Sequence, residues 1–145
     1  MCGGHCSPAD AEAEGAAAWG WGDGARAATL RRSEAEWRQV LSPSQFQVLR
    51  QGYTEGFGTH AYTHFFPSGG YFACAACGLP LYSASAKFRD PGWPAWDRCF
   101  RSSIWGCHVV ARPGAGGLEI RCARCNSHLG HVFHGERRTR TNERH

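Results

Sequence analysis

The chain has 145 residues, a length that predicts a single domain with a buried core. The net charge of +4 is modest, and no apolar run reaches the roughly 18 residues of a membrane span, so a soluble protein without nucleic-acid or membrane partners is expected. Eight cysteines without a secretion signal favour metal binding or thiol chemistry over a disulfide framework.

The first segment, residues 1–32, is rich in Ala and Gly and shows no apolar period. This composition predicts a disordered or weakly ordered tail. Its acids, including Asp10 and Glu12, are unlike a secretory signal or a transit peptide, so we expect a cytoplasmic protein, with an organelle not excluded. Cys2 and Cys6 are unusual residues for a linker and leave a function for the tail open.

Two short helices are predicted where order begins. Ser33 and Glu36 have the spacing of a capping box, and Ser42 and Gln45 repeat that spacing at a second helix start. Gly52 then marks the end of the second helix. These helices open a domain that we place at residues 33–145.

The remainder of that domain is predicted to be β-rich. From residue 56 onward, glycine and proline separate clusters of aromatic and β-branched residues, a pattern typical of short antiparallel strands. The expected strands are residues 71–73, 104–110, 118–122 and 129–133, with a turn at 112–117.

Two matching cysteine pairs indicate a metal site. Cys74 and Cys77 form one Cys-x-x-Cys knuckle, and Cys122 and Cys125 form the other. Four thiolates are the ligands that structural Zn²⁺ prefers in a closed tetrahedral site. We therefore predict a mainly β fold, with antiparallel sheets around one structural zinc ion and two short N-terminal helices. The alternative is a pair of redox or disulfide cysteine pairs.

Three further residues have the chemistry of a reactive site. His128 and His131 follow the second knuckle, and Trp93 lies between a glycine and a proline that restrict the backbone. Each residue taken alone is better explained as part of the core or as a spare ligand. Their weight comes from the combination described next.

The order and spacing of several motifs resemble the methionine sulfoxide reductase B family. The motifs are Gly-Trp-Pro-Ala-Trp at 92–96 and Cys-Asn-Ser-His-Leu-Gly-His-Val-Phe at 125–133, together with the two knuckles. Trp-Arg-Gln-Val-Leu-Ser at 37–42 and Gly-Gly-Tyr-Phe-Ala-Cys at 69–74 agree with it as well. The resemblance extends from about residue 34 to residue 145.

The resemblance implies an activity and a role for each site residue. Members reduce methionine-R-sulfoxide in peptides, and free methionine-R-sulfoxide is a further candidate substrate. Trp93 matches the tryptophan that holds the substrate methyl group, and Phe133 would add to the same wall. His128 and His131 match the histidines on the oxygen side, where an imidazole can donate a proton. Arg144 matches the arginine two positions before the nucleophile, where a positive charge favours the ionised form.

The sequence departs from the family pattern at two places. The nucleophile is expected immediately after His145, so the 145 residues lack it and are expected to be inactive. Pro91 stands where many cysteine-type members have a resolving cysteine. Both departures lead to the hypothesis of a selenoprotein that is truncated at the selenocysteine codon.

The resemblance further implies a resolving thiol and a thioredoxin-type reductant. Cys2 and Cys6 are the candidates for the resolving cysteine because a flexible tail can bring them to the site. Cys99 and Cys107 are alternatives, for which an inert buried thiol is the favoured interpretation. The protein is expected to act as a monomer.

Two rival functions come from other classes. The first is a zinc-ribbon module that binds nucleic acid through the C-terminal arginines, which are Arg137, Arg138, Arg140 and Arg144. The second is a catalytically dead zinc-binding module that keeps the fold and binds methionine sulfoxide without reducing it.

Overall fold

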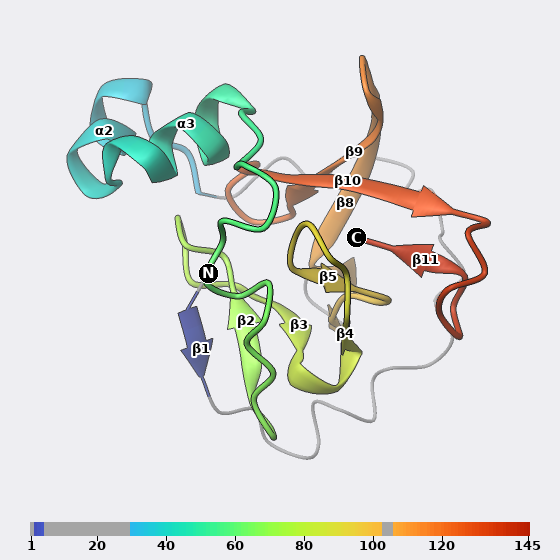
Figure 1. The fold of residues 1–145 in the computed structure, drawn as a ribbon. Coiled ribbons are helices and arrows are strands. Elements are labelled where there is room, and N and C mark those ends of the chain that lie inside the picture. Colours follow the sequence, from blue (N-terminus) through green and yellow to red (C-terminus); the bar gives the residue numbers. More distant parts are fainter. Residues whose placement is uncertain (1, 5–29, 103–105) are drawn as a thin grey trace.

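The computed structural model describes residues 2–4, 30–102 and 106–145, which form helices and short strands (Figure 1). The helices are α2 (Glu34–Val40) and α3 (Pro43–Gln51), with a single 3₁₀ turn at Ala84–Ala86. The strands are β1 (Cys2–Gly4), β2 (Tyr71–Ala73), β3 (Pro80–Ser83), β4 (Lys87–Phe88), β5 (Ala95–Trp96), β6 (Arg101–Ser102), β7 (Gly106–Cys107), β8 (Val109–Gly114), β9 (Gly117–Cys122), β10 (His128–His134) and β11 (Glu143–Arg144).

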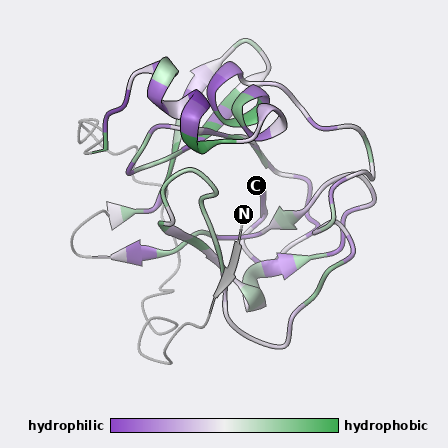
Figure 2. Ribbon diagram, turned by 90° about the vertical axis from the view of Figure 1, so that its left-hand side faces the viewer, coloured by the Kyte–Doolittle hydropathy of each residue, from purple (hydrophilic) through white to green (hydrophobic). Residues whose placement is uncertain are grey.

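Both helices begin where the capping boxes predict. The Ser33 hydroxyl accepts a hydrogen bond from the Glu36 amide, and the Ser42 hydroxyl accepts one from the Gln45 amide. α3 ends at Gly52 as expected. In Figure 2 the two helices carry both hydrophilic and hydrophobic residues, as amphipathic surface helices do. Among the described residues, neither helix has the length or the apolar character needed to cross a bilayer.

The strands form small antiparallel sheets, so the predicted mainly β fold is confirmed. The largest has the order β11-β10-β9-β8, and a second has the order β1-β2-β3. The pairs β4-β5 and β6-β7 complete the described set. Figure 1 shows the helices beside one end of β10 and the chain terminus marked C between β5 and β11.

The strand predicted at 104–110 begins outside the described residues, and its described part, 106–110, is interrupted. The turn predicted at 112–117 is shorter than expected. The His108 amide donates to the Phe100 carbonyl, whereas the His108 carbonyl accepts from the Ala123 amide. The chain therefore changes pairing partner at His108, and β7 ends where β8 begins. β8 and β9 stay paired as far as Gly114 and Gly117, which leaves two residues for the turn.

A β-bulge in β10 sets the direction of the two histidines. His128 pairs with Arg121, but His131 pairs with Glu119, so the register shifts by one residue between them. Residues three apart on a regular strand face opposite sides, and one extra residue returns the second side chain to the first face. Gly130, at φ 150°, lies at this shift.

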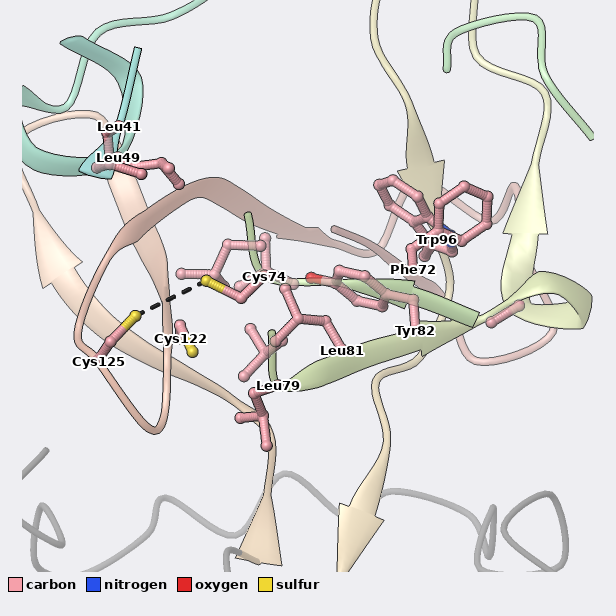
Figure 3. Close-up of a cluster of buried hydrophobic side chains, with 14 of the residues drawn as sticks. Leu41, Leu49, Phe72, Cys74, Leu79, Leu81, Tyr82, Trp96, Cys122 and Cys125 are labelled. Atoms are coloured by element: carbon pink, nitrogen blue, oxygen red, sulfur yellow. Dashed lines mark hydrogen bonds between the residues drawn. The ribbon is translucent and has the colours of Figure 1, made fainter. Parts of the chain in front are cut away.

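An aromatic and aliphatic core joins the helices to the sheets. Tyr82 stacks on Trp96 with ring centroids 4.6 Å apart, and Phe72 packs edge-on against Trp96 (Figure 3). Arg50 on α3 donates to the Cys125 carbonyl at 3.3 Å and pairs with Glu34 of α2 at 3.0 Å. The helices are thereby fixed against the second cysteine knuckle.

The predicted boundary between a tail at 1–32 and a domain at 33–145 stays a prediction. Residues 2–4 pair with β2, and the Leu30 amide donates to the Arg124 carbonyl at 3.0 Å. Residues 5–29 lie outside the described part of the chain.

Candidate functional site

The two cysteine knuckles have the same backbone geometry. The Gly78 amide donates to the Cys74 carbonyl at 2.8 Å, and the Asn126 amide donates to the Cys122 carbonyl at 2.9 Å. Gly78 and Asn126 have φ of 74° and 59°, the positive values that their residue types predict. Each knuckle therefore turns its two sulfurs to one side.

The four cysteine sulfurs come together as predicted and fit a metal ion. The Cys74 and Cys125 sulfurs are 3.7 Å apart, those of Cys77 and Cys122 are 3.6 Å apart, and all four lie within 4.8 Å of one another. A tetrahedral ion with Zn–S bonds of about 2.3 Å requires sulfurs about 3.8 Å apart. Figure 3 shows the Cys74, Cys122 and Cys125 sulfurs turned toward one another.

Trp93 is held by the loop that precedes β5. The Asp90 carboxylate accepts from the Gly92 amide at 3.0 Å, and the Trp93 indole N–H donates to the Glu55 carbonyl at 2.8 Å. The Phe57 ring lies edge-on to the indole at 5.3 Å, and a Cβ added at Gly92 would lie 2.7 Å from that ring. The indole is therefore fixed at two edges although it is 37% exposed.

The Asp90 carboxylate is itself anchored. Its second oxygen accepts from Arg138 at 2.9 Å. Burial opposes ionisation of Asp90, but hydrogen bonds from the Gly92 amide and Arg138 outweigh it and hold the pKa below its usual value. Hydrogen bonds to an ionised carboxylate thus hold the loop that carries Trp93.

His128 is buried and faces a carboxylate. Its Nδ1 donates to Glu119 Oε1 at 2.6 Å, and Arg121 also donates to that oxygen at 2.8 Å. Burial opposes ionisation of Glu119, but hydrogen bonds from His128 and Arg121 outweigh it and lower its pKa. An ionised Glu119 fixes the His128 ring with its proton on Nδ1, which leaves Nε2 for a ligand.

His131 lies farther along the same face of β10. Its ring centroid is 5.8 Å from that of His128 and 6.5 Å from that of Phe133. A Cβ added at Gly116, in the β8–β9 turn, would lie 3.1 Å from His131 Nε2. His131 therefore stands between the turn and the cavity, outside the deeper His128.

Arg144 lies over Phe133 and pairs with an acid. Its guanidinium carbon is 4.3 Å from the centre of the Phe133 ring. It donates to both Glu136 oxygens, at 2.8 and 2.7 Å, and this bidentate contact raises the pKa of Arg144. The positive charge predicted at this position is present, and it forms an ion pair with Glu136.

His145 is built into the floor of the site. Its amide donates to the Trp96 carbonyl at 2.9 Å, and its carbonyl accepts from the Trp96 amide at 3.4 Å. Its Nδ1 lies 3.4 Å from the Tyr82 hydroxyl. The backbone that follows Arg144 is thereby pinned to β5.

The site residues that the sequence predicts outside the metal cluster line one cavity of about 320 Å³. They are Trp93, His128, His131, Phe133 and Arg144, and His145 lies beside them. The wall also includes side chains that were not predicted, namely Tyr53, His60, Tyr82 and Trp96. A cavity with an aromatic wall, an imidazole pair and a guanidinium suits a small ligand with an apolar group and a polar oxygen.

Glu119, the carboxylate partner of His128, is a candidate residue that sequence reasoning missed. A signal for it exists, because Glu119 and Arg121 alternate with the buried Ile120 and Cys122 and therefore share the polar face of β9. The cross-strand register that places Glu119 beside His128 depends on the bulge.

The tail candidates for the resolving cysteine, Cys2 and Cys6, stay predictions. The backbone of Cys2 pairs with that of Ala73 between β1 and β2. Cys6 lies outside the described part of the chain. Cys99 and Cys107, expected to be buried, are both half-buried.

Comparisons with known proteins identify relatives across most of the chain. A family profile described as the SelR domain matches residues 41–145. Peptide methionine sulfoxide reductase B5 of Oryza sativa subsp. japonica is 47% identical over 116 residues, which cover 79% of this chain and 82% of that protein. Peptide methionine sulfoxide reductase B5 of Arabidopsis thaliana is 43% identical over 113 residues, covering 77% and 78%.

Longer relatives match as well. Peptide methionine sulfoxide reductase B3, chloroplastic, of Oryza sativa subsp. japonica is 46% identical over 119 residues, 81% of this chain. The chain spans 50% of the length of that protein and 57% of the B2, chloroplastic, protein of Arabidopsis thaliana. The match of the SelR domain and of these relatives shows that the chain belongs to the methionine sulfoxide reductase B family.

Proposed function

We propose that this protein reduces methionine-R-sulfoxide in peptides and proteins to methionine. One observation carries the proposal: the Trp93 indole and the His128 and His131 imidazoles line a single cavity beside the Arg144–His145 segment. The relatives are named peptide methionine sulfoxide reductases, which supports peptide-bound substrate.

The two sides of the cavity suit the two sides of the substrate. The sulfoxide methyl group would lie on the Trp93 face, with Phe133 beside it. The oxygen would point to the histidines, where His128 Nε2 can supply a proton while Glu119 holds the ring in place. In the other epimer the methyl group and the oxygen are exchanged, so the oxygen would lie on the indole. This arrangement therefore favours one epimer.

The nucleophile is proposed to follow His145 directly. His145 lines the cavity and is hydrogen-bonded to Trp96 through its backbone, so the next residue starts at the cavity wall. Arg144 supplies a positive charge that favours a thiolate or selenolate there. We propose selenocysteine, because Pro91 replaces the resolving cysteine of many cysteine-type members.

The proposed reaction balances in three steps. The nucleophile attacks the sulfoxide sulfur, the oxygen is protonated, and methionine leaves while the nucleophile becomes a sulfenic or selenenic acid. A resolving thiol, for which Cys2 and Cys6 are the tail candidates, condenses with it and releases water. A thioredoxin-type dithiol then reopens that bond by exchange.

The metal is proposed to be one structural Zn²⁺ held by Cys74, Cys77, Cys122 and Cys125. A closed four-thiolate site leaves no position for substrate, so the ion would hold the knuckles together without taking part in the reaction. We further propose a monomer located in the cytoplasm, with an organelle as the alternative because two relatives are named chloroplastic.

A nucleic-acid-binding function is not favoured by the C-terminal arginines. Arg138 pairs with Asp90 at 2.9 Å and Arg144 pairs with Glu136 at 2.7 Å. The carboxylates beside two of the four arginines lower the net positive charge of this segment, which phosphate binding would need.

The test appends one residue to the chain. A variant with cysteine directly after His145 is compared with a variant carrying serine there, using R- and S-epimer peptides and a dithiol reductant. The cysteine variant should reduce the R epimer alone, and the serine variant neither. Trp93→Ala in the cysteine background should lower kcat/KM by about tenfold, or ~1.4 kcal/mol. Reduction of the S epimer by the cysteine variant would contradict the proposal. A cysteine variant that neither reduces nor binds the R epimer would contradict it as well.

A further inference from the structure

The β6–β7 hairpin brings together two cysteines that the proposed reaction leaves unused. Arg101 pairs with Cys107, and the His108 amide donates to the Phe100 carbonyl at 2.9 Å. The same antiparallel register places Cys99 opposite Val109. Cys99 and Cys107 are therefore diagonal neighbours on one face of the hairpin, because alternate residues of a strand share a face.

The two thiols are close enough to share a hydrogen bond. Diagonal residues of an antiparallel pair have Cα atoms about 7–8 Å apart, and a disulfide needs no more than about 6.8 Å. A movement of about 1 Å would close the bond. Strands of two residues each, such as β6 and β7, permit that movement more easily than a long ladder does.

The hairpin makes the two thiols unequal. The hydrogen bond from Cys99 lowers the pKa of Cys107 to about 6, with help from the Arg101 charge. The same contact and burial raise the pKa of Cys99 well above its usual value. At neutral pH this pair would hold one thiolate and one thiol, the pattern of an attacking and a waiting cysteine.

The pair is distinct from the metal site, and neither cysteine lines the cavity. It contributes no sulfur to the four-cysteine cluster. Burial raises the pKa of Tyr82, and the charge of nearby Cys99 adds to this effect. The Tyr82 hydroxyl contacts His145. Cys107 likewise lies within electrostatic reach of Glu143, two residues before His145.

We propose that Cys99 and Cys107 form a second redox site, a dithiol that closes reversibly to a disulfide by exchange with a disulfide-type bond. That bond comes from one of two sources, a small disulfide such as oxidised glutathione or the bond between the reductase nucleophile and its resolving thiol. The second source rests on the proposed function, and the first does not.

The exchange balances with either source. The Cys107 thiolate attacks one sulfur of the disulfide and expels a thiolate, which leaves a mixed disulfide on Cys107. The Cys99 thiol loses its proton and attacks Cys107, and the second thiolate leaves. The two cysteines lose two electrons and two protons, and the disulfide gains both.

The first experiment uses the zinc-loaded 145-residue chain and oxidised glutathione. Free thiols are alkylated, and a non-reducing peptide mass map locates the disulfides. A peptide pair linked through Cys99 and Cys107 should appear, and a dithiol reductant should remove it while the zinc stays bound. Alkylation of both cysteines as free thiols, or a Cys107–glutathione adduct that never closes, would exclude a small disulfide as the source.

Two single substitutions test the assigned roles. Cys99→Ser should accumulate glutathione on Cys107, whereas Cys107→Ser should leave Cys99 unmodified. Equal adducts on the two variants, or none, would refute the inequality of the thiols. Zinc content reports whether each variant is folded, and the wild-type map stands independently of both variants.

A second arm distinguishes the two sources. The cysteine-appended chain receives methionine-R-sulfoxide as its sole oxidant. Linkage in both arms shows that both sources oxidise the pair. Linkage with glutathione alone assigns the source to solution disulfides, and linkage with the sulfoxide alone assigns it to the reductase site. Linkage in neither arm overturns the proposal. Absence of methionine production with linkage by glutathione would contradict the proposed function alone.

Discussion

At the scale of single residues, the candidate site depends on charged partners behind the groups that face the cavity. Glu119 contacts His128 at 2.6 Å, and Glu136 contacts Arg144 at 2.7 Å. Both carboxylates have lowered pKa values, so they stay ionised at neutral pH. A carboxylate behind an imidazole fixes the orientation of the ring.

Glu119→Gln should therefore slow the reaction with little effect on substrate binding. A carboxylate partner contributes about ten- to a hundredfold where the imidazole binds a metal, and we expect a fall in kcat of that order. The measurement is steady-state kinetics in the cysteine-appended chain. The matched control is Glu34→Gln, which removes an exposed carboxylate that does not line the cavity and should leave kcat unchanged. A change in KM alone would contradict the role.

The same residue predicts a pH dependence of stability. Because the folded pKa of Glu119 lies below its ordinary value of 4.5, ionised Glu119 stabilises the fold above that pH. The stabilisation is lost as pH falls through the folded pKa. Urea unfolding of wild type and Glu119→Gln from about pH 6 to about pH 3 should show the two free energies of unfolding converging at the acid end. A constant difference would refute the linkage.

At the scale of secondary structure, the bulge in β10 is the feature that makes the imidazole pair. Without the register shift, His128 and His131 would face opposite sides of the sheet. Gly130 permits the shift because φ of 150° is rarely adopted by residues with a Cβ.

Gly130→Ala should destabilise the fold by about 1–2 kcal/mol, because an L side chain is strained in this region. It should also lower activity by moving His128 relative to His131. Gly69→Ala is the matched control, since a Cβ there meets nothing within 4 Å, and we expect a change within about 0.5 kcal/mol. Equal effects of the two substitutions, measured by urea unfolding and kinetics, would show that the bulge geometry is unimportant.

Locally encoded elements are the ones that could be predicted from sequence. The capping boxes at Ser33 and Ser42 and the knuckle turns at Gly78 and Asn126 depend on residues within four positions of one another. The role of Glu119 depends on cross-strand register.

The break at His108 likewise could not be read from the sequence, because it depends on which of two strands the backbone bonds to. Tyr82 and Trp96 look like ordinary core residues, and their stacked pair becomes the cavity floor through the pairing of β5 with the last residues. Contacts between distant segments decide these features.

At the scale of the whole molecule, the two knuckles join parts of the chain that are far apart in sequence. Cys74 and Cys125 are separated by 51 positions, yet their sulfurs lie 3.7 Å apart. The first knuckle follows β2, and the second lies between β9 and β10, which carries the histidines. The cluster therefore connects the two larger sheets.

Loss of one ligand should unfold the domain. Thiolate–zinc binding contributes on the order of 10 kcal/mol to folding of small zinc domains, comparable with the whole stability of a domain. Cys122→Ser should lose zinc and the cooperative thermal transition, and a chelator should have the same effect on wild type. Cys107→Ser is the control, since Cys107 lies outside the cluster, and it should keep one zinc per chain. A Cys122→Ser variant that melts like wild type would contradict a structural role for the metal.

The most direct test of the central claim is an NMR titration of the zinc-loaded chain with peptides that carry each epimer of methionine sulfoxide. Binding at one cavity predicts that the R epimer shifts the Trp93 indole signal and the His128 and His131 ring signals together, with a common dissociation constant. The S epimer should leave them in place. Equal shifts with both epimers, or R-epimer binding that moves the indole without the imidazoles, would contradict it.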